Sequence, residues 1–247
     1  MKKQVVLTVA ESKRLIAKGV AALPEVKSAM TNGIVVVATG TTNAYVLEEL
    51  WNKRIDKRRY RSGVTTPDIP EKTDVKQEEA IPDVVFRNGI LAKDLDRYNA
   101  VQHMGKGDVY IKGANALDYI GQMAGVLIGS PTGGTVGAVI GNVIGKQITL
   151  IIPIGLEKLV YEDIYELHRL TMNQDYDGPK MWPINGVIIT EIEAIGLLFG
   201  VDATLLAAGG VAGAEGSVRL LIDGVDGDVE SALKDIKEIK GEPRYIL

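Results

Sequence analysis

Five runs of consecutive apolar residues constrain the fold more than any other feature of the chain. They lie at 33–38, 83–86, 108–111, 125–128 and 148–154. Polar residues do not alternate with apolar ones inside these runs, as they would in a strand with one face in water. Such runs are typical of strands that are buried on both faces, as in a parallel sheet covered by helices. The sequence therefore predicts an α/β fold with a mainly parallel open sheet and helices on both faces.

Helix signals lie before, between and after these runs. A Thr followed three residues later by Glu, which is the spacing of a capping box, occurs at Thr8 and Glu11 and again at Thr190 and Glu193. Apolar residues follow both pairs at helical intervals. The expected helices lie at about 8–24, 44–55, 161–172 and 194–199.

The last third of the chain has a different pattern of expected strands and helices from the first two thirds. Strands are expected at 186–189, 203–207 and 218–222, and a helix at 229–239. We divide the chain into an α/β ligand-binding core, 1–180, which includes a surface excursion at 53–82, and a smaller C-terminal α+β extension, 181–247. The extension either continues the main sheet or forms a small subdomain. Its glycine loop, 209–216, is either a mobile cover over a pocket or a wide hairpin connection.

Composition and targeting signals narrow the class of protein. The chain has 247 residues, no cysteine and a net charge of −4. Absence of cysteine excludes disulfides and thiolate sites and fits a reducing compartment, and the negative net charge gives no general electrostatic case for nucleic acid. The apolar run 5–10 is too short for an export signal. We therefore expect a cytoplasmic protein.

Two segments have alternative interpretations. The uncharged stretch 119–145 carries a glycine at every fourth position, which is typical of a membrane span. The turn sequence at 130–134 interrupts it and favours a strand, a glycine loop and a packed helix, so no membrane association is expected. The basic run 53–61 could steer phosphate or RNA, but it contains only Tyr60 as a stacking aromatic and favours a solvated helix end.

Three turns after predicted strands are candidates for ligand binding, because ligands of open α/β sheets lie beyond the carboxyl ends of the strands. Each turn supplies small residues, hydroxyl groups or a positive charge that suit an anionic ligand. The candidate residues are Thr39, Gly40, Thr41, Thr42 and Asn43 in the first turn, Lys112, Asn115 and Asp118 in the second, and Gly129, Ser130, Thr132, Gly133, Gly134 and Thr135 in the third.

Each candidate also has a structural interpretation. Thr42 and Asn43 are ordinary residues near a helix start, and Asp118 is an ordinary turn or cap residue. Lys112 could extend along the surface with its ammonium group in water. Gly133 and Gly134 could serve only to let a helix pack closely against the sheet.

The order of strand, TGTTN, helix, basic segment, strand and DVYIKGANALD resembles the superfamily of ribose-5-phosphate isomerases, glucosamine-6-phosphate deaminases, related sugar-sensing regulators and CoA transferases. The resemblance covers about residues 10–160. In the isomerases an early GTGST loop holds phosphate and a later DGADE turn lies beside the sugar. Residues 40–43 fall on the first motif and residues 112–116 on the second. The resemblance implies an isomerase- or CoA-transferase-like fold and an anionic substrate.

The sequence departs from this pattern at the second motif, where Lys112 and Asn115 replace carboxylates, and at the third turn, where SPTGG replaces a lysine- and glycine-rich segment. These departures argue against sugar isomerisation as such. By resemblance to the CoA transferases, Glu157 is a candidate nucleophile, although a glutamate in the first turn of a helix also has a purely structural role. Glu191 is a candidate acid or base if it is buried, and a helix-capping residue otherwise.

These observations predict a cytoplasmic enzyme that binds a small phosphorylated or carboxylate metabolite, such as a sugar phosphate or an acyl-CoA. Lys112 would neutralise the substrate, Asn115 would orient it, and Asp118, Glu157 or Glu191 would supply a carboxylate. No cofactor is predicted, with coenzyme A possible only as substrate, and no metal site is predicted, because the chain has two histidines and no HExxH motif. The alternative is a non-catalytic sensing or regulatory module. We expect a homo-oligomer.

Overall fold

The computed structural model describes residues 1–63, 65–66 and 80–245. Its centre is a six-stranded mixed sheet with the strand order β10-β8-β5-β2-β3-β4. The first four of these strands are parallel, and β3 and β4 are antiparallel. The strands are β2 (Ile34–Val37), β3 (Val84–Arg87), β4 (Ile90–Leu91), β5 (Val109–Ile111), β8 (Thr149–Pro153) and β10 (Val187–Ile189). The prediction of an α/β fold whose sheet is mostly parallel is confirmed.

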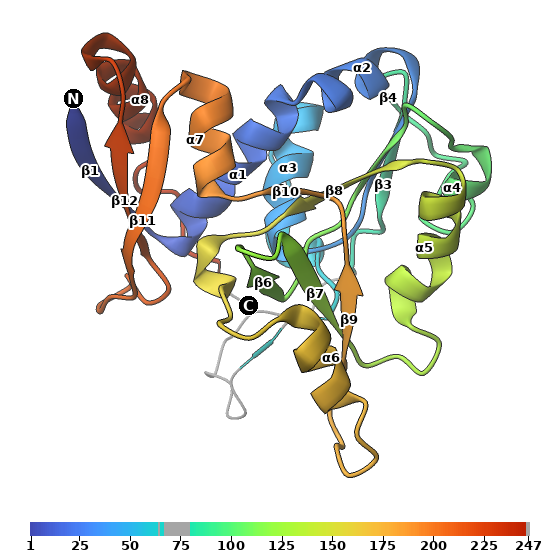
Figure 1. Cartoon of the computed structure of the whole chain (residues 1–247). Coiled ribbons are helices and arrows are strands. Elements are labelled where there is room, and N and C mark those ends of the chain that lie inside the picture. The colour runs from blue at the N-terminus through green and yellow to red at the C-terminus, as the bar shows by residue number, and fades with distance from the viewer. Residues whose placement is uncertain (64, 67–79, 246–247) are drawn as a thin grey trace.

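Helices cover this sheet (Figure 1), with α1 and α3 on one side and α4 and α5 on the other. Val139 and Val143 of α5 share the lining of a small cavity with Tyr110 of β5 and Leu150 of β8, so this helix packs directly on the sheet. The helices in the first two thirds of the chain are α1 (Val9–Ala22), α2 (Pro24–Asn32), α3 (Thr41–Trp51), α4 (Ala100–His103) and α5 (Gly134–Gly145). Their apolar faces and the central strands form one continuous core.

Both predicted capping boxes are present. Thr8 caps α1 with Glu11 in the reciprocal position, and Thr190 caps α7 (Glu191–Phe199) with Glu193. Each box satisfies donors that the first turn of a helix leaves without partners. The first helix ends at Ala22, and the next begins at Pro24. Proline is tolerated in the first turn of a helix but not in its interior, where its ring clashes with the preceding turn, so α1 and α2 do not form one continuous helix.

The prediction that residues 125–128 belong to the parallel sheet is wrong. They lie in β7 (Met123–Ile128), the middle strand of a separate antiparallel sheet with β6 (Ala116–Asp118) and β9 (Lys180–Ile184). The chain reverses in a tight turn between β6 and β7, where Gln122 has a φ of 51°. This turn lets β7 pair with β6, the strand directly before it in the chain. This second sheet packs against α6 (Ile164–Thr171) and η2 (Leu156–Lys158).

A third sheet joins the two ends of the described chain. It has the order β1-β12-β11 and is antiparallel throughout. Its strands are β1 (Lys2–Leu7), β11 (Asp202–Ala208) and β12 (Val218–Asp223), and α8 (Asp226–Glu238) contacts β1. The apolar run 5–10, considered above only as a targeting signal, is thus divided between the end of β1 and the start of α1. Residues 181–247 contribute strands to all three sheets.

The expected excursion at 53–82 lies partly outside the described residues. Its described part contains η1 (Lys57–Arg59) and Tyr60, which is completely buried. Within the described ranges, no helix combines the length and the apolar character that crossing a membrane requires. The uncharged stretch 119–145 is divided between β7, a turn and α5.

Candidate functional site

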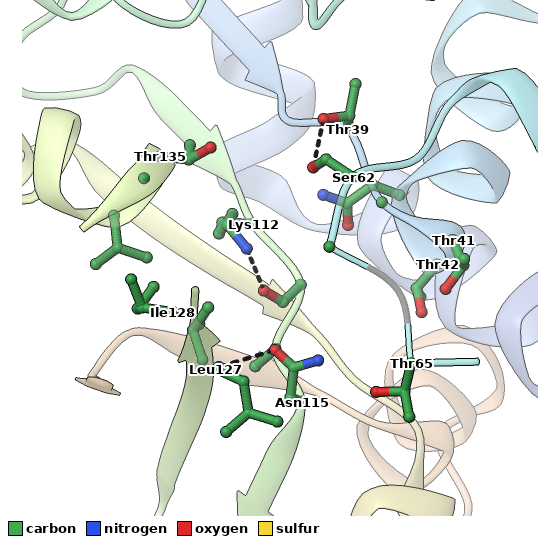
Figure 2. Close-up of a pocket in the computed structure, with 18 of the residues that line it drawn as sticks. Thr39, Thr41, Thr42, Ser62, Thr65, Lys112, Asn115, Leu127, Ile128 and Thr135 are labelled. Atoms are coloured by element: carbon green, nitrogen blue, oxygen red, sulfur yellow. Dashed lines mark hydrogen bonds between the residues drawn. The ribbon is translucent and has the colours of Figure 1, made fainter. Parts of the chain in front are cut away.

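The main cavity has a volume of about 920 Å³ and opens where β2, β5 and β7 end. Figure 2 shows Lys112 near its centre, with Thr135 on one side and Thr41 and Thr42 on the other. All three turns that the sequence singled out reach this cavity. Its lining comprises Lys13, Thr39, Gly40, Thr41, Thr42, Asn43, Ser62, Gly63, Thr65, Arg97, Tyr98, Lys112, Gly113, Ala114, Asn115, Val126, Leu127, Ile128, Gly129, Ser130, Gly134, Thr135, Val136, Lys158 and Tyr245.

The first turn presents the N-terminus of α3 to the cavity. Gly40 is the N-cap and has no side chain that could accept from the first-turn N–H groups of the helix. Those groups therefore carry the positive end of the helix dipole toward the cavity. Asn43, only 1% exposed, donates through Nδ2 to the carbonyl of Ala38 at 2.7 Å, while its Oδ1 has no hydrogen-bond partner. Asn43 therefore ties the start of α3 to the end of β2, and its Oδ1 is a buried acceptor without a hydrogen-bond partner in the described part of the chain.

The second turn contributes Lys112 and Asn115. Lys112 follows β5, and its Nζ donates to the carbonyl of Gly113 at 3.0 Å. Asn115 Oδ1 accepts from the backbone N–H of Leu127 at 3.0 Å, which joins this turn to β7. Asp118 lies outside the cavity lining and accepts from the N–H of Gly121 at 2.8 Å, which is the structural role considered for it.

The third turn presents the N-terminus of α5. Gly133 is its N-cap at a φ of 79°, and no side chain caps the helix. Gly129, Ser130, Gly134 and Thr135 line the cavity, whereas Thr132 and Gly133 do not. A Cβ atom on Gly133 would lie 2.8 Å from the Trp182 ring and 3.0 Å from the Cα atom of Gly137, so this glycine permits close packing.

Four cationic side chains line the cavity, namely Lys13, Arg97, Lys112 and Lys158. Among the described residues, no aspartate or glutamate lines it. Arg97 is partly neutralised, because its Nε lies 3.0 Å from Asp83 Oδ2, and its Nη1 donates to Thr135 at 3.1 Å. No carboxylate of the described chain lies within ion-pair distance of the three lysines. The described lining of the cavity is therefore positively charged.

Burial shifts the ionisation of these lysines. It is the main cause that lowers the pKa of Lys112 to about 8, and the nearby charge of Lys158 lowers it further. Burial also lowers the pKa of Lys13 to about 8, against the opposing effect of Glu157, and lowers the pKa of Lys158. Lysines without a counter-ion in a partly dehydrated site gain the most from an anionic ligand.

The sequence analysis did not identify Lys13, Arg97, Lys158 or Tyr245 as cavity residues. Lys13 projects from the middle of α1 and is only 8% exposed. Lys158 lies in η2, and its Nζ donates to the carbonyl of Ala114 at 2.7 Å. A lysine within a helix is usually expected to be exposed. Only the spacing of the apolar residues around Lys13 could have suggested that its side chain is buried. Nothing nearby in the sequence indicates the position of Tyr245.

Glu157 and Glu191 lie together, but neither lines the cavity. Glu191 is completely buried and accepts from the backbone N–H of Leu156 at 2.9 Å. Burial, followed by the negative charge of Glu157, raises the pKa of Glu191 to about 7. One carboxylate oxygen of each side chain is buried without a hydrogen-bond partner. The two groups form a carboxyl pair in which Glu191 is buried and Glu157 is half-buried, and Lys13 is close enough to sense the charge of Glu157.

The remaining segments considered above lie elsewhere or have structural contacts. Arg54 and Lys57 of the basic run form ion pairs with the buried Glu48, at 2.9 and 3.3 Å. Residues 209–216 do not line the cavity. No group of three or more His, Asp or Glu side chains within the described ranges is arranged to hold a metal ion.

No protein-family model, curated protein or solved structure matches this chain.

Proposed function

We propose that the chain is a cytoplasmic enzyme that binds a small anionic metabolite in the main cavity. One observation carries this proposal: four cationic side chains and no carboxylate of the described residues line the cavity. Burial disfavours the protonated form of the lysines, and a bound anion would stabilise that form again. A phosphate or carboxylate group therefore matches the charge of the site better than a neutral or cationic ligand.

Two helix N-termini support the same proposal. The first turns of α3 and α5 both reach the cavity, and both helices have glycine N-caps without side-chain acceptors. Their free N–H groups suit phosphate or carboxylate oxygens. Thr41, Thr42 and Ser130 add hydroxyl groups beside them. Each end of the cavity thus combines backbone donors with side-chain donors.

The proposed substrates are sugar phosphates or acyl-CoA compounds, and the proposed chemistry is isomerase- or transferase-like. The volume of about 920 Å³ lies near the upper end of typical ligand cavities, so it accommodates a substrate larger than a simple inorganic anion. Val126, Leu127 and Ile128 give one wall an apolar surface next to the cations. Lys112 would neutralise the anionic group and Asn115 would position β7 against it.

A second candidate function is non-catalytic sensing of the same class of metabolite. The position of the carboxylates favours it, because Asp118, Glu157 and Glu191 all lie outside the cavity lining. Binding without turnover would support this alternative. We also propose that the protein acts as a homo-oligomer.

The test is calorimetric titration of the purified protein with a sugar phosphate, a CoA ester, inorganic phosphate and a neutral sugar. We expect the anionic compounds to bind and the neutral sugar not to bind. Lys112→Ala should weaken binding, whereas Lys234→Ala, a change at an exposed lysine of α8, should not. Equal binding of neutral and anionic compounds, or no binding of any anion, would contradict the proposal.

A further inference from the structure

The chemistry available in the cavity is unusual for an enzyme. No aspartate, glutamate, histidine or cysteine of the described chain lines it. Its ionisable side chains are Lys13, Arg97, Lys112 and Lys158, together with Tyr98 and Tyr245. Arginine stays protonated in proteins, and tyrosine ionises well above neutral pH. Lysine amines are therefore the groups that can offer an electron pair to a substrate here.

Lys112 differs from the other two lysines in its charged surroundings. The positive charges of Lys158 and Arg97 both lower its pKa. Its one nearby carboxylate, Asp83, is already paired with Arg97 at 3.0 Å. Lys13 and Lys158, in contrast, both sense the negative charge of Glu157, which favours their protonated forms. Of the three amines, Lys112 is thus the one whose pKa is lowered by two neighbouring cations and is not raised by Glu157.

The position of Lys112 also suits attack on a bound ligand. It follows β5 at the centre of the cavity, between Thr135 at the start of α5 and Thr41 at the start of α3 (Figure 2). Its Nζ donates to the backbone carbonyl of Gly113 and, within the described residues, to no side-chain acceptor. A ligand anchored through its anionic group at either helix start would extend toward this amine.

We propose that Lys112 forms a Schiff base with an aldehyde or ketone that carries a phosphate or carboxylate group. This inference rests on the proposed function and specifies both the substrate class and the reacting atom. The electron pair of the neutral Nζ forms a bond to the carbonyl carbon while the π electron pair of the C=O bond moves to the oxygen. One proton then passes from the nitrogen to that oxygen, which gives a neutral carbinolamine. The oxygen takes a second proton from solvent and leaves as water when the C–O bond breaks. The nitrogen electron pair forms the C=N double bond at the same time, and the remaining N–H proton stays on the nitrogen of the protonated Schiff base.

The ionisation of Lys112 is compatible with this step. With its pKa lowered to about 8 by burial and by Lys158, roughly a tenth of the amine is neutral at pH 7. An unperturbed lysine has less than about a thousandth in that form. Desolvation and neighbouring cations are the usual means of activating a Schiff-base lysine.

The experiment is reductive trapping with glycolaldehyde phosphate and sodium cyanoborohydride, followed by peptide mapping by mass spectrometry. We expect one reduced adduct per chain, located on Lys112, and its loss when excess sulfate competes for the anion site. Lys112→Arg, which keeps the charge, should abolish this adduct, whereas Lys234→Arg should not change it. Mapping in the wild-type protein tests the site even where the Lys112 variant does not fold.

The outcomes separate this inference from the proposed function. If phosphate binds by calorimetry but no adduct forms, or if the adduct lies on Lys13 or Lys158, the Schiff-base assignment is wrong and anion binding stands. If labelling spreads over exposed lysines and sulfate does not compete, the assignment is also wrong. If neither phosphate nor glycolaldehyde phosphate binds, both proposals fall.

Discussion

The guanidinium of Arg14 and the carboxylate of Glu48 lie 2.5 Å apart, with both side chains at least 97% buried. Arg14 also contacts Glu49 and Glu242, at 2.8 and 3.0 Å, so one arginine on α1 connects α3 with the end of the described chain. Removing one partner from such a group leaves uncompensated charge in the interior. We expect Arg14→Met to lower the free energy of unfolding by about 3 kcal/mol in urea denaturation.

Lys18 on the same helix provides the matched control. It is 45% exposed and lies 3.8 Å from Glu49, so Lys18→Met should change stability by less than about 1 kcal/mol. Similar effects of the two substitutions would show that the buried ion pairs of Arg14 do not stabilise the fold.

The carboxyl pair of Glu157 and Glu191 predicts that the free energy of unfolding depends on pH. Since the folded-state pKa of Glu191, about 7, is above its ordinary value, the folded protein binds this proton more strongly than the unfolded chain does. The resulting stabilisation is complete below about pH 4.5 and is lost as pH rises through about 7. Relative to Glu191→Gln, the wild type should lose about 3 kcal/mol across this range in urea denaturation. The exposed-site control Glu230→Gln should keep the wild-type slope, and an unchanged slope in Glu191→Gln would refute this assignment.

Two glycines of α5 should respond in opposite directions to alanine. Gly133 has a φ of 79°, and its Cβ atom would meet the Trp182 ring at 2.8 Å, so Gly133→Ala should lower the melting temperature and weaken anion binding. Gly141 lies inside the helix with no atom within 4 Å of its Cβ position, so Gly141→Ala should stabilise the protein by about 0.5–1 kcal/mol. Thermal unfolding compares the two variants directly, and a stabilising Gly133→Ala would contradict the packing argument.

Anion affinity should decrease in alkaline solution. Lys13 and Lys112 lose their positive charge as pH rises through their lowered pKa values of about 8. Sulfate keeps its own charge there, so its affinity should fall about tenfold between pH 7 and pH 9 for each lysine that contributes. Calorimetric titration checks this, and Lys112→Arg should flatten the profile because arginine stays charged. A constant affinity up to pH 9 would show that neither lysine binds the anion.

Local sequence signals predicted the elements well where short-range chemistry decides them. The capping pairs Thr8–Glu11 and Thr190–Glu193 begin helices as expected, because a cap depends on residues three apart. The buried β-branched run at Ile34–Val37 forms a central strand for a similar reason. The turns after β2, β5 and β7 then meet at one cavity, which their positions after predicted strands suggested.

Pairing between distant segments could not be predicted in the same way. The apolar run of β7 is compatible with the central sheet and with the second, antiparallel sheet. β7 lies in the second sheet because β6, which precedes it in the chain, forms a hairpin with it. Lys13 and Lys158 reach the cavity only because α1 packs on α3 and because Leu117 forms a bridge with Leu159. No local pattern encodes such contacts, so the sequence located the turns of the site but missed three of the four described cations that line it.

The pairing of β1 with β12 sets an order of events for folding. Lys2 lies opposite Asp223, and Leu7 lies opposite Val218, so more than two hundred residues separate the partners. During synthesis on the ribosome, Val5 and Leu7 have no partner strand until β12 has emerged. Contacts of such long sequence separation close slowly. The third sheet can therefore be completed only after residues 218–223 have been synthesised, however early the first strand leaves the ribosome.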